Sequence, residues 1–276
     1  MTDDTTNTTA GPFHGRVLVV DDEDVNRLVA RGMIEVLGID PDFAESGAQA
    51  IEKSASHHYD LILMDVQMPG IDGIEATTLI RQQEQTAGRE RASIVALTAN
   101  VTKGDRERCL DAGMDDFMAK PLMRDILIAT FERWLGGLGD QGDQGDQGSL
   151  DGPGPGDTAS TLDSDRLAAL GQAMQSVPGG LRRVLESYQE SLSRLPAAII
   201  HAGQSDDFDA MARAAHALKS NSAAAGALKL SALSADLEKA ARAGDVMAIG
   251  ALILGIENEL GDVKLAIAAE LDGTSK

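Results

Sequence analysis

The sequence predicts two domains of different fold class: an N-terminal α/β domain with a doubly wound, five-stranded parallel sheet, and a C-terminal all-α four-helix bundle. Three observations support this. The 276 residues suit two domains of roughly 100–200 residues each. Short apolar runs alternate with helical patterns only in the first half, and a stretch rich in Gly, Asp and Gln separates the halves. The predicted parts are a disordered tail, an α/β domain, a flexible linker and a helical bundle, at residues 1–15, 16–135, 136–161 and 162–276.

Five short apolar runs predict the strands of the first domain, at residues 16–20, 41–44, 61–64, 94–97 and 116–119. Amphipathic stretches predict helices that begin near Asp24, Gly47, Gly73, Lys103 and Leu122. Strands that alternate with helices of about 10–15 residues imply a parallel sheet covered on both faces.

The second domain contains no such runs, and its apolar residues recur at helical spacing. Breaks at residues 178–180, 203–206, Gly226 and Gly244 divide it into about five helices. The simplest arrangement is a four-helix bundle with a short leading helix. We expect Pro196 to kink or interrupt the second helix, because proline removes a backbone hydrogen bond.

Composition excludes several functions. The formal net charge of −20 argues against a nucleic-acid-binding surface or a basic helix on a membrane. The longest apolar run, residues 246–256, is shorter than the ~20 residues of a membrane span. A single cysteine, Cys109, excludes an intramolecular disulfide and fits a reducing compartment. We therefore expect a cytoplasmic protein that binds neither nucleic acid nor membranes.

Polar side chains follow four of the predicted strands. Asp21 and Asp22 follow the first strand and Asp65 the third, while Thr98 and Lys120 follow the fourth and fifth. Ligands of open parallel sheets bind at this edge. Three carboxylates together require a cation, and oxygen ligands favour Mg²⁺ or Mn²⁺. Any one of these residues alone is more simply structural, for instance as a helix cap, but their joint placement favours phosphoryl transfer.

The segments VLVVDDEDVNR, LILMDVQMPGIDG, ALTAN and FMAKP resemble, in order, the motifs of response-regulator receiver domains, especially those of hybrid histidine kinases. The resemblance covers about residues 16–135 and implies a flavodoxin-like fold. It also implies that Asp65 is the phosphoacceptor. Asp21 and Asp22 would bind Mg²⁺ together with Asp65 and the backbone carbonyl of Gln67.

The same resemblance implies roles for three further residues. Lys120 and Thr98 would contact the phosphoryl group, and Phe117 would be the switch aromatic that rotates together with Thr98 on phosphorylation. The Lys120–Pro121 peptide bond would be cis, an isomer that proline makes accessible.

In the second domain, His216 lies in the segment DAMARAAHALKSNSAAAGA. The expected core-facing stripe of this helix is Met211, Ala214, Leu218 and Ala225. His216 would then lie about 200° away from the stripe and face water, with Arg213 and Lys219 beside it. An exposed imidazole in a locally positive patch suits a nucleophile that accepts and returns a phosphoryl group. Spacing alone, however, favours an ordinary solvent-exposed histidine.

The segment HALKSNSAAAGA resembles the signature of histidine-containing phosphotransfer (HPt) domains, a resemblance that covers about residues 162–272. It implies that His216 is the phosphorylated residue and that Lys219 stabilises the phosphate. Ser220 stands where the family usually has Gly, and Asn221 where it usually has Ser or Ala. Both side chains are small to medium in size, so we expect a receiver domain still to dock.

Together the two resemblances imply a phosphorelay protein. Asp65 would take phosphate from the phosphohistidine of a sensor histidine kinase, and His216 would exchange it with a receiver aspartate in this or another protein. The linker would allow direct exchange between Asp65 and His216 at an effective concentration on the order of millimolar. No ATP-binding glycine box is seen in the sequence, so we expect a phosphocarrier and not an ATP-dependent kinase.

Two alternatives come from other functional classes. A haloacid-dehalogenase-like, Mg²⁺-dependent phosphatase also uses Asp, Thr or Ser, and Lys at strand ends, and Asp22-x-Asp24 mimics its opening motif. That family has its nucleophile after the first strand, whereas here the isolated carboxylate, Asp65, follows the third. The other alternative is a non-catalytic adaptor, in which the helical bundle only binds a partner or dimerises.

Overall fold

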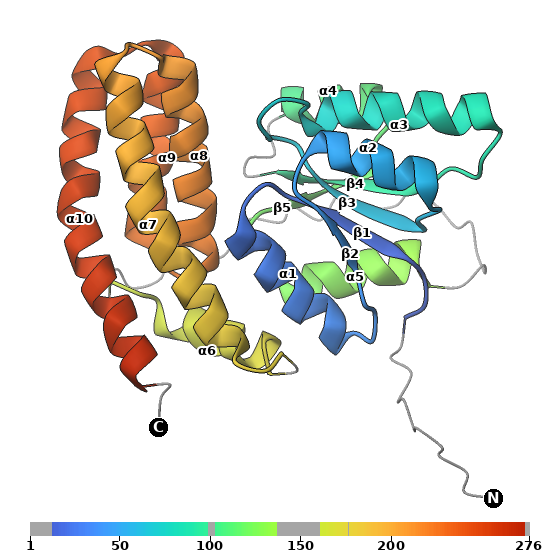
Figure 1. The fold of residues 1–276 in the computed structure, drawn as a ribbon, viewed down its shortest axis with the longest axis horizontal. Coiled ribbons are helices and arrows are strands. Elements are labelled where there is room, and N and C mark those ends of the chain that lie inside the picture. Colours follow the sequence, from blue (N-terminus) through green and yellow to red (C-terminus); the bar gives the residue numbers. More distant parts are fainter. Residues whose placement is uncertain (1–12, 99–102, 137–160, 176, 274–276) are drawn as a thin grey trace, which may run out of the picture. The chain divides into compact units, whose positions relative to one another are not determined.

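The computed structural model describes residues 13–98, 103–136, 161–175 and 177–273 (Figure 1). Two compact units divide the chain, one formed by Met1–Gly136 with Ala173–Pro178 and the other by Gly137–Gln172 with Gly179–Lys276. Most of the predicted tail and linker lies outside the described residues. No helix in the described ranges is long and apolar enough to cross a membrane.

A parallel sheet of five strands organises the first unit. The strands are β1 (Val17–Val20), β2 (Asp42–Ala44), β3 (Leu61–Asp65), β4 (Ser93–Thr98) and β5 (Asp116–Ala119). Their order across the sheet is β2-β1-β3-β4-β5, and every neighbouring pair is parallel. The predicted sheet is thus confirmed. Because Val20 pairs with Met64 and Thr98 with Ala119, the residues that follow these strands emerge at one edge.

Five helices cover the two faces of this sheet: α1 (Asp24–Val36), α2 (Gly47–Ser56), α3 (Gly73–Ala87), α4 (Lys103–Asp111) and α5 (Arg124–Trp134). Alternate strand residues point to opposite faces, so Val17 and Val19 pack with α1 and α5, while Leu18 and Val20 pack in the core on the other face. Figure 1 shows α1 and α5 on one side of the sheet and α2, α3 and α4 on the other. The domain is doubly wound, as predicted.

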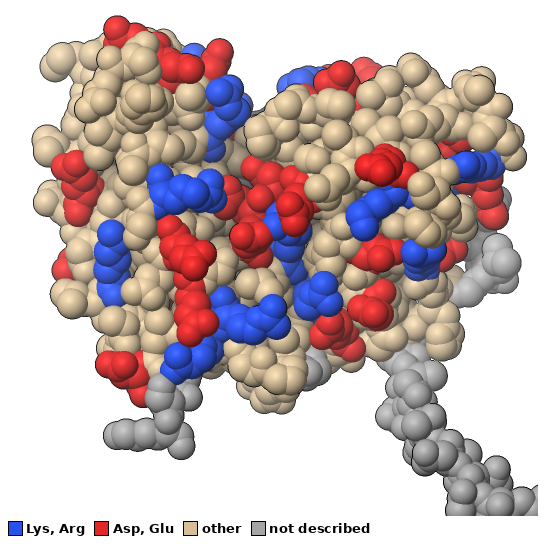
Figure 2. Space-filling model, in the orientation of Figure 1, with Lys and Arg blue, Asp and Glu red and all other residues tan. Residues whose placement is uncertain are grey.

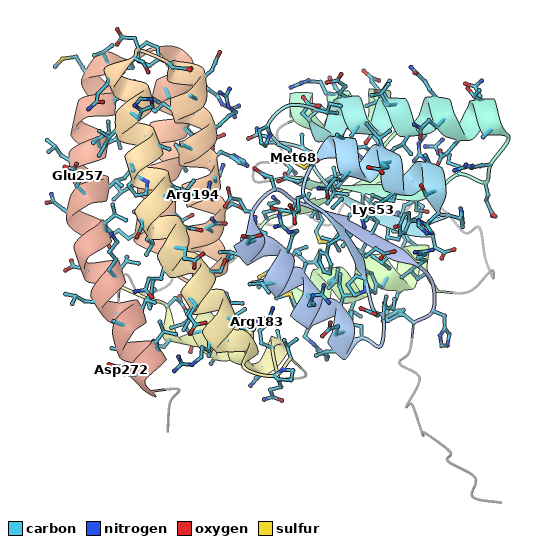
Figure 3. All side chains as sticks on the ribbon, in the orientation of Figure 1. Lys53, Met68, Arg183, Arg194, Glu257 and Asp272 are labelled. Carbon is cyan, nitrogen blue, oxygen red and sulfur yellow. The ribbon has the colours of Figure 1, made fainter. Side chains whose placement is uncertain are left out.

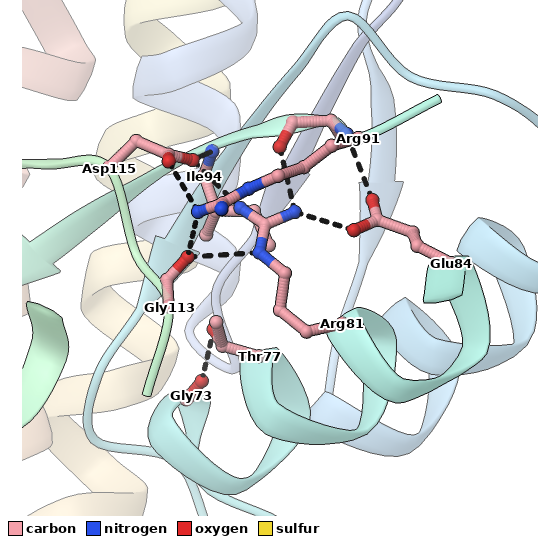
Figure 4. Close-up of polar contacts among 9 residues, drawn as sticks. Gly73, Thr77, Arg81, Glu84, Arg91, Ile94, Gly113 and Asp115 are labelled. Atoms are coloured by element: carbon pink, nitrogen blue, oxygen red, sulfur yellow. Dashed lines mark hydrogen bonds and ion pairs between the residues drawn. The ribbon is translucent and has the colours of Figure 1, made fainter. Parts of the chain in front are cut away.

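A largely buried arginine fixes the turn that precedes β5 (Figure 4). Arg81 of α3 donates from Nη2 to Asp115 Oδ2 at 2.7 Å and from Nε to the Gly113 carbonyl at 2.9 Å. Asp115 Oδ2 also accepts from the Ile94 backbone N–H of β4 at 2.8 Å. These bonds connect α3, β4 and the start of β5, and so set the position of the polar residues at the far end of β5.

The second unit is helical: α6 (Ser164–Ala173), α7 (Gly180–Gln204), α8 (Phe208–Ala224), α9 (Leu228–Ala243) and α10 (Val246–Gly273). The last four form a bundle in which α8 contacts α7 and α9, and α10 contacts α9 and α7. The predicted bundle and its breaks are confirmed. The prediction that Pro196 could interrupt α7 is wrong, because the helix runs unbroken through 25 residues. Buried Leu195 and Ile199 anchor α7 in the bundle on either side of the proline.

Candidate functional site

Three carboxylates meet at the carboxyl edge of the sheet. Asp21 and Asp22 directly follow β1, Asp65 is the last residue of β3, and one oxygen of each lies within 4.8 Å of the others. Asp21 and Asp65 are buried. The sequence predicted this cluster correctly, because paired parallel strands that end in register bring the residues after them together.

Lys120, which follows β5, reaches into the carboxylate cluster. Its Nζ donates to Asp21 Oδ2 at 2.6 Å and to Asp65 Oδ2 at 2.7 Å, and its side chain is only 6% exposed. The Lys120 backbone N–H donates to the Thr98 carbonyl at 2.8 Å, so Thr98 at the end of β4 lies beside it. The Lys120–Pro121 peptide bond is cis, as the resemblance implied.

Backbone and amide donors orient two of the carboxylates. Asp65 Oδ1 accepts from the Gln67 backbone N–H at 3.1 Å. Asp21 Oδ1 accepts from the Glu23 backbone N–H and from Asn26 Nδ2, both at 3.0 Å. Gly73 at the start of α3 allows this packing, since a Cβ there would lie 2.1 Å from the Asp65 carbonyl oxygen. The cluster is therefore held rigidly by the strand ends and the loops that follow them.

The charges of the cluster are not balanced. Burial raises the pKa of Asp22 to about 6, and the negative charges of Asp21 and Glu23 add to the shift. Burial also raises the pKa of Asp65 above its ordinary value, although the ammonium of Lys120 opposes the effect. For Lys120, burial disfavours the charged form, but the carboxylates of Asp21 and Asp65 outweigh it and raise the pKa. Because one ammonium faces three carboxylates, a hard divalent cation fits this set of oxygen donors.

The two residues expected to form a switch lie on neighbouring strands. Thr98 ends β4, and Phe117 lies in β5 opposite Ala96. Both side chains are half-buried. The Arg106 guanidinium of α4 lies 5.2 Å from the centre of the Phe117 ring, within the range of a cation–π contact. The structure thus places the Phe117 ring beside the Arg106 side chain of α4.

In the helical unit, His216 of α8 contacts an acidic residue of α9. Its Nδ1 lies 3.1 Å from Glu238 Oε1, and the residue is 8% exposed. The prediction that His216 faces water is therefore wrong. The expected core stripe was too narrow, because α8 packs against both α7 and α9 and buries Ala212 and Ala215 in addition to Met211.

Glu238 is the residue of this site that sequence reasoning missed. Its Oε2 accepts from Lys219 Nζ at 2.6 Å, and its Oε1 from Arg242 Nη2 at 2.7 Å. Burial alone would raise the pKa of Glu238, but the hydrogen bonds and charges of His216 and Lys219 lower it to about 2. Lys219, predicted as a positive neighbour of the imidazole, is thus paired with Glu238. The i, i+4 spacing of Glu238 and Arg242 was visible in the sequence, but the approach of α9 to His216 was not.

The unusual Asn221 lies inside the bundle. Its Nδ2 donates to Ser191 Oγ of α7 at 3.2 Å, and the neighbouring Ser222 Oγ accepts from the Tyr188 hydroxyl at 2.9 Å. The Asn221 side chain, which departs from the family pattern, therefore serves the packing of α8 against α7. Histidines elsewhere are exposed: His14, His57, His58 and His201.

Comparison with known families gives one match in each unit. A response regulator receiver domain matches residues 17–132, and an Hpt domain matches residues 179–266. These ranges coincide with the unit that carries the carboxylate cluster and with the bundle that carries His216.

Among curated proteins, the chain is 43% identical over 113 residues to hybrid signal transduction histidine kinase L of Dictyostelium discoideum. The matched region covers 40% of this chain and 7% of that protein. The chain is 38% identical over 121 residues to sensor protein GacS of Pseudomonas syringae pv. syringae, with coverage of 44% and 13%. The chain thus spans only a small part of the length of these relatives.

Two of the solved structures that resemble part of the chain illustrate the match. The receiver domain of a sensor histidine kinase from Pseudomonas aeruginosa PAO1, crystallised with a magnesium ion in its active-site cleft, is 42% identical with a TM-score of 0.41, covering 46% of this chain and 100% of that one. The co-crystal of Saccharomyces cerevisiae Ypd1 with the receiver domain of Ssk1 gives 29% identity and a TM-score of 0.43, with coverage of 44% and 89%.

Proposed function

Because the chain carries a response regulator receiver domain at residues 17–132 and an Hpt domain at residues 179–266, we propose that it is a phosphorelay protein with two phosphorylated residues, Asp65 and His216. The observation that carries the proposal is the bridge from Lys120 Nζ to the buried carboxylates of Asp21 and Asp65. A strand-end carboxylate beside a fixed ammonium is placed to accept a phosphoryl group and to neutralise its charge.

At Asp65, a carboxylate oxygen attacks the phosphorus of a donor phosphohistidine. The new O–P bond forms as the N–P bond of the donor breaks, and the donor imidazole takes up a proton. Lys120, already within 2.7 Å of Asp65, pairs with one phosphoryl oxygen, and the Thr98 hydroxyl donates to another. Because these donors are already in place, their pairing with the phosphoryl oxygens lowers the activation barrier of phosphoryl transfer.

We also propose that the carboxylate cluster binds a divalent cation. Asp21, Asp22 and Asp65, together with the backbone carbonyl of Gln67, would hold Mg²⁺ or Mn²⁺. The proximity of the three carboxylates supports this assignment. When bound, the cation supplies positive charge that screens the incoming phosphoryl group from the carboxylates.

At His216, Glu238 acts as a positioning residue. The ionised carboxylate of Glu238 favours the tautomer in which Nδ1 carries the proton, and this leaves a lone pair on Nε2. We assign Nε2 as the atom that bonds to phosphorus. The Nε2–P bond forms as the O–P bond of a receiver acyl phosphate breaks, and the reverse step returns the group. Lys219 and Arg242, which contact Glu238, add positive charge near the transferred group.

The proposed partners follow from these two reactions. A sensor histidine kinase would phosphorylate Asp65, and other receiver or Hpt proteins would exchange phosphate with His216 or Asp65. Exchange within one chain, between Asp65 and His216, is part of the proposal. The matched domains are phosphorelay modules and not kinase cores, so we propose that the chain carries phosphate without hydrolysing ATP. A reducing, cytoplasmic location, expected from its single cysteine, completes the proposal.

Labelling with a small-molecule donor tests the role of Asp65. We expect Mg²⁺ and acetyl phosphate to phosphorylate the protein at Asp65, and chelation of Mg²⁺ to suppress the label. Asp65→Asn should abolish it, whereas Asp40→Asn, at an exposed position of the same unit, should not. Mass spectrometry of borohydride-trapped peptides locates the acyl phosphate. An acyl phosphate on Asp22 instead of Asp65, or turnover of a generic phosphate ester that survives Asp65→Ala but not Asp22→Ala, would favour a phosphatase.

A further inference from the structure

The outer face of α10 carries an exposed apolar stripe. Its positions are separated alternately by four and three residues: Met247, Ala251, Leu254, Asn258, Gly261, Leu265 and Ala268. All seven are exposed, and Met247, Leu254 and Leu265 are 87%, 62% and 72% exposed. We call these seven residues the α10 seam. In Figure 2 the surface over α10 is largely uncharged, with isolated acidic and basic side chains.

The opposite face of α10 already forms its share of the bundle core. Ile249, Ile256, Val263 and Ile267 are buried where α10 packs against α7 and α9. The helix is thus apolar on two faces, and only one of them is covered within the described part of the chain. A helix that is apolar on both sides is expected to be buried on both sides.

The spacing of the seam is that of a coiled coil. Apolar residues that repeat every 3.5 residues, in steps of four and three, are those that pack into a second helix. The 28 residues of α10 extend for about 42 Å, enough for three such repeats. The seam is also open to close approach, since a Cβ added at Gly250 or Gly261 would meet nothing within 4 Å.

We propose that the α10 seam pairs with the α10 seam of a second copy of this chain, in antiparallel orientation about a two-fold axis. Side-chain size supports one register. With Leu254 opposite Leu265 of the second copy, the spacing also places Ala251 opposite Ala268 and Asn258 opposite Gly261. Leucine then faces leucine, and alanine faces alanine.

Charge supports the antiparallel register and disfavours the parallel one. Glu257 and Lys264 each precede a seam residue by one position and flank the seam. In the antiparallel register Glu257 meets Lys264 of the second copy, and the two-fold axis makes this pair twice. In a parallel register Glu257 would meet Asp262 instead, and like charges would repel. Glu257 projects away from the bundle in Figure 3, and neither it nor Lys264 forms an ion pair with any described residue.

Pairing through α10 would not cover α8, the helix that carries His216. The helices contact one another in the ring α7, α8, α9, α10, so α8 lies diagonally across the bundle from α10. The helix that carries His216 and the proposed dimer surface are therefore on opposite sides of this unit. A dimer of this kind would present two copies of His216, and its existence does not depend on the proposed phosphorelay function.

Sedimentation equilibrium of the full chain tests the proposal. We expect the wild-type protein to have the mass of a dimer, and the double variant Leu254→Glu/Leu265→Glu to have that of a monomer with an unchanged circular dichroism spectrum. The control Ile200→Glu replaces an exposed apolar residue of α7 and should remain dimeric. A monomeric wild type at high micromolar concentration, or a dimer that survives the double substitution, would overturn the proposal.

Charge reversal tests the register. Glu257→Lys and Lys264→Glu alone each turn two attractive pairs into repulsive ones, which should raise the dimer Kd by about tenfold. The double variant Glu257→Lys/Lys264→Glu restores complementarity and should dimerise like the wild type. A parallel register predicts that Glu257→Lys lowers the dimer Kd, because the new lysine would face Asp262 of the second copy. Tightening by Glu257→Lys would refute the antiparallel arrangement.

Discussion

Glu238→Gln is expected to slow phosphoryl transfer to His216 by about 10- to 100-fold, the range known for removal of a residue that orients a metal-binding histidine. The substitution keeps the size of the side chain but removes the charge that favours a proton on Nδ1. Because the pKa of Glu238 is lowered to about 2, the wild-type residue is ionised throughout the pH range of such an assay. The initial rate with a phosphorylated receiver as donor measures the effect.

A second measurement separates positioning from a merely structural role. Nitrogen-15 NMR of the imidazole should show the proton on Nδ1 in the wild-type protein and a loss of that preference in Glu238→Gln. Glu190→Gln, at an exposed position of α7, is the matched control and should change neither the tautomer nor the rate. If Glu238→Gln transfers phosphate at the wild-type rate with an unchanged tautomer, Glu238 does not position the imidazole.

Lys120→Gln is expected to abolish labelling of Asp65 and to destabilise the first unit by about 3 kcal/mol without divalent cation. Removing one partner of a buried ion pair leaves uncompensated charge, which typically costs about 3–5 kcal/mol. Here Asp21 and Asp65, both buried, would lose the ammonium that contacts them at 2.6 and 2.7 Å. Added Mg²⁺ should recover part of the stability but none of the labelling, because it restores charge balance without replacing the contact of Lys120 to the phosphoryl group.

Urea unfolding with and without Mg²⁺ measures this effect. The control is Arg133→Gln, which removes an exposed ion pair to Asp116 at 2.8 Å in the same unit. Exposed pairs contribute about 0–1 kcal/mol, so this variant should unfold close to the wild type. A loss of stability in Lys120→Gln no larger than that in Arg133→Gln would show that the buried ammonium does not balance the cluster.

The sequence was most informative where position along the chain determines position in space. Asp21 follows β1 and Asp65 ends β3, and these two strands pair in register, so their meeting could be expected from the α/β alternation alone. Lys120 could be placed at the same edge for the same reason. The bonds from Lys120 to these two carboxylates needed the structure, since they depend on how the chain turns after β5.

The helical bundle was less predictable, because helix spacing does not say which neighbour covers a face. His216 was placed towards water on the assumption of a single core-facing stripe, whereas α8 contacts two helices. Glu238 lies 22 residues away in the chain and was missed for that reason. At Pro196 the local sequence favours a break in the helix, but tertiary packing keeps α7 continuous.

The central claim, that Asp65 and His216 both carry phosphate, is tested most directly by the chemical stability of the bound phosphate. The wild-type chain, Asp65→Asn and His216→Gln are each incubated with a phosphorylated histidine kinase, separated from it, and treated with acid or alkali. The wild type should release one fraction in alkali, from an acyl phosphate, and a second fraction that survives alkali but is released in acid, from a phosphohistidine. The first fraction should be absent from Asp65→Asn and the second from His216→Gln. Alkali-stable, acid-labile phosphate that persists in His216→Gln, or alkali-labile phosphate that persists in Asp65→Asn, would contradict the claim.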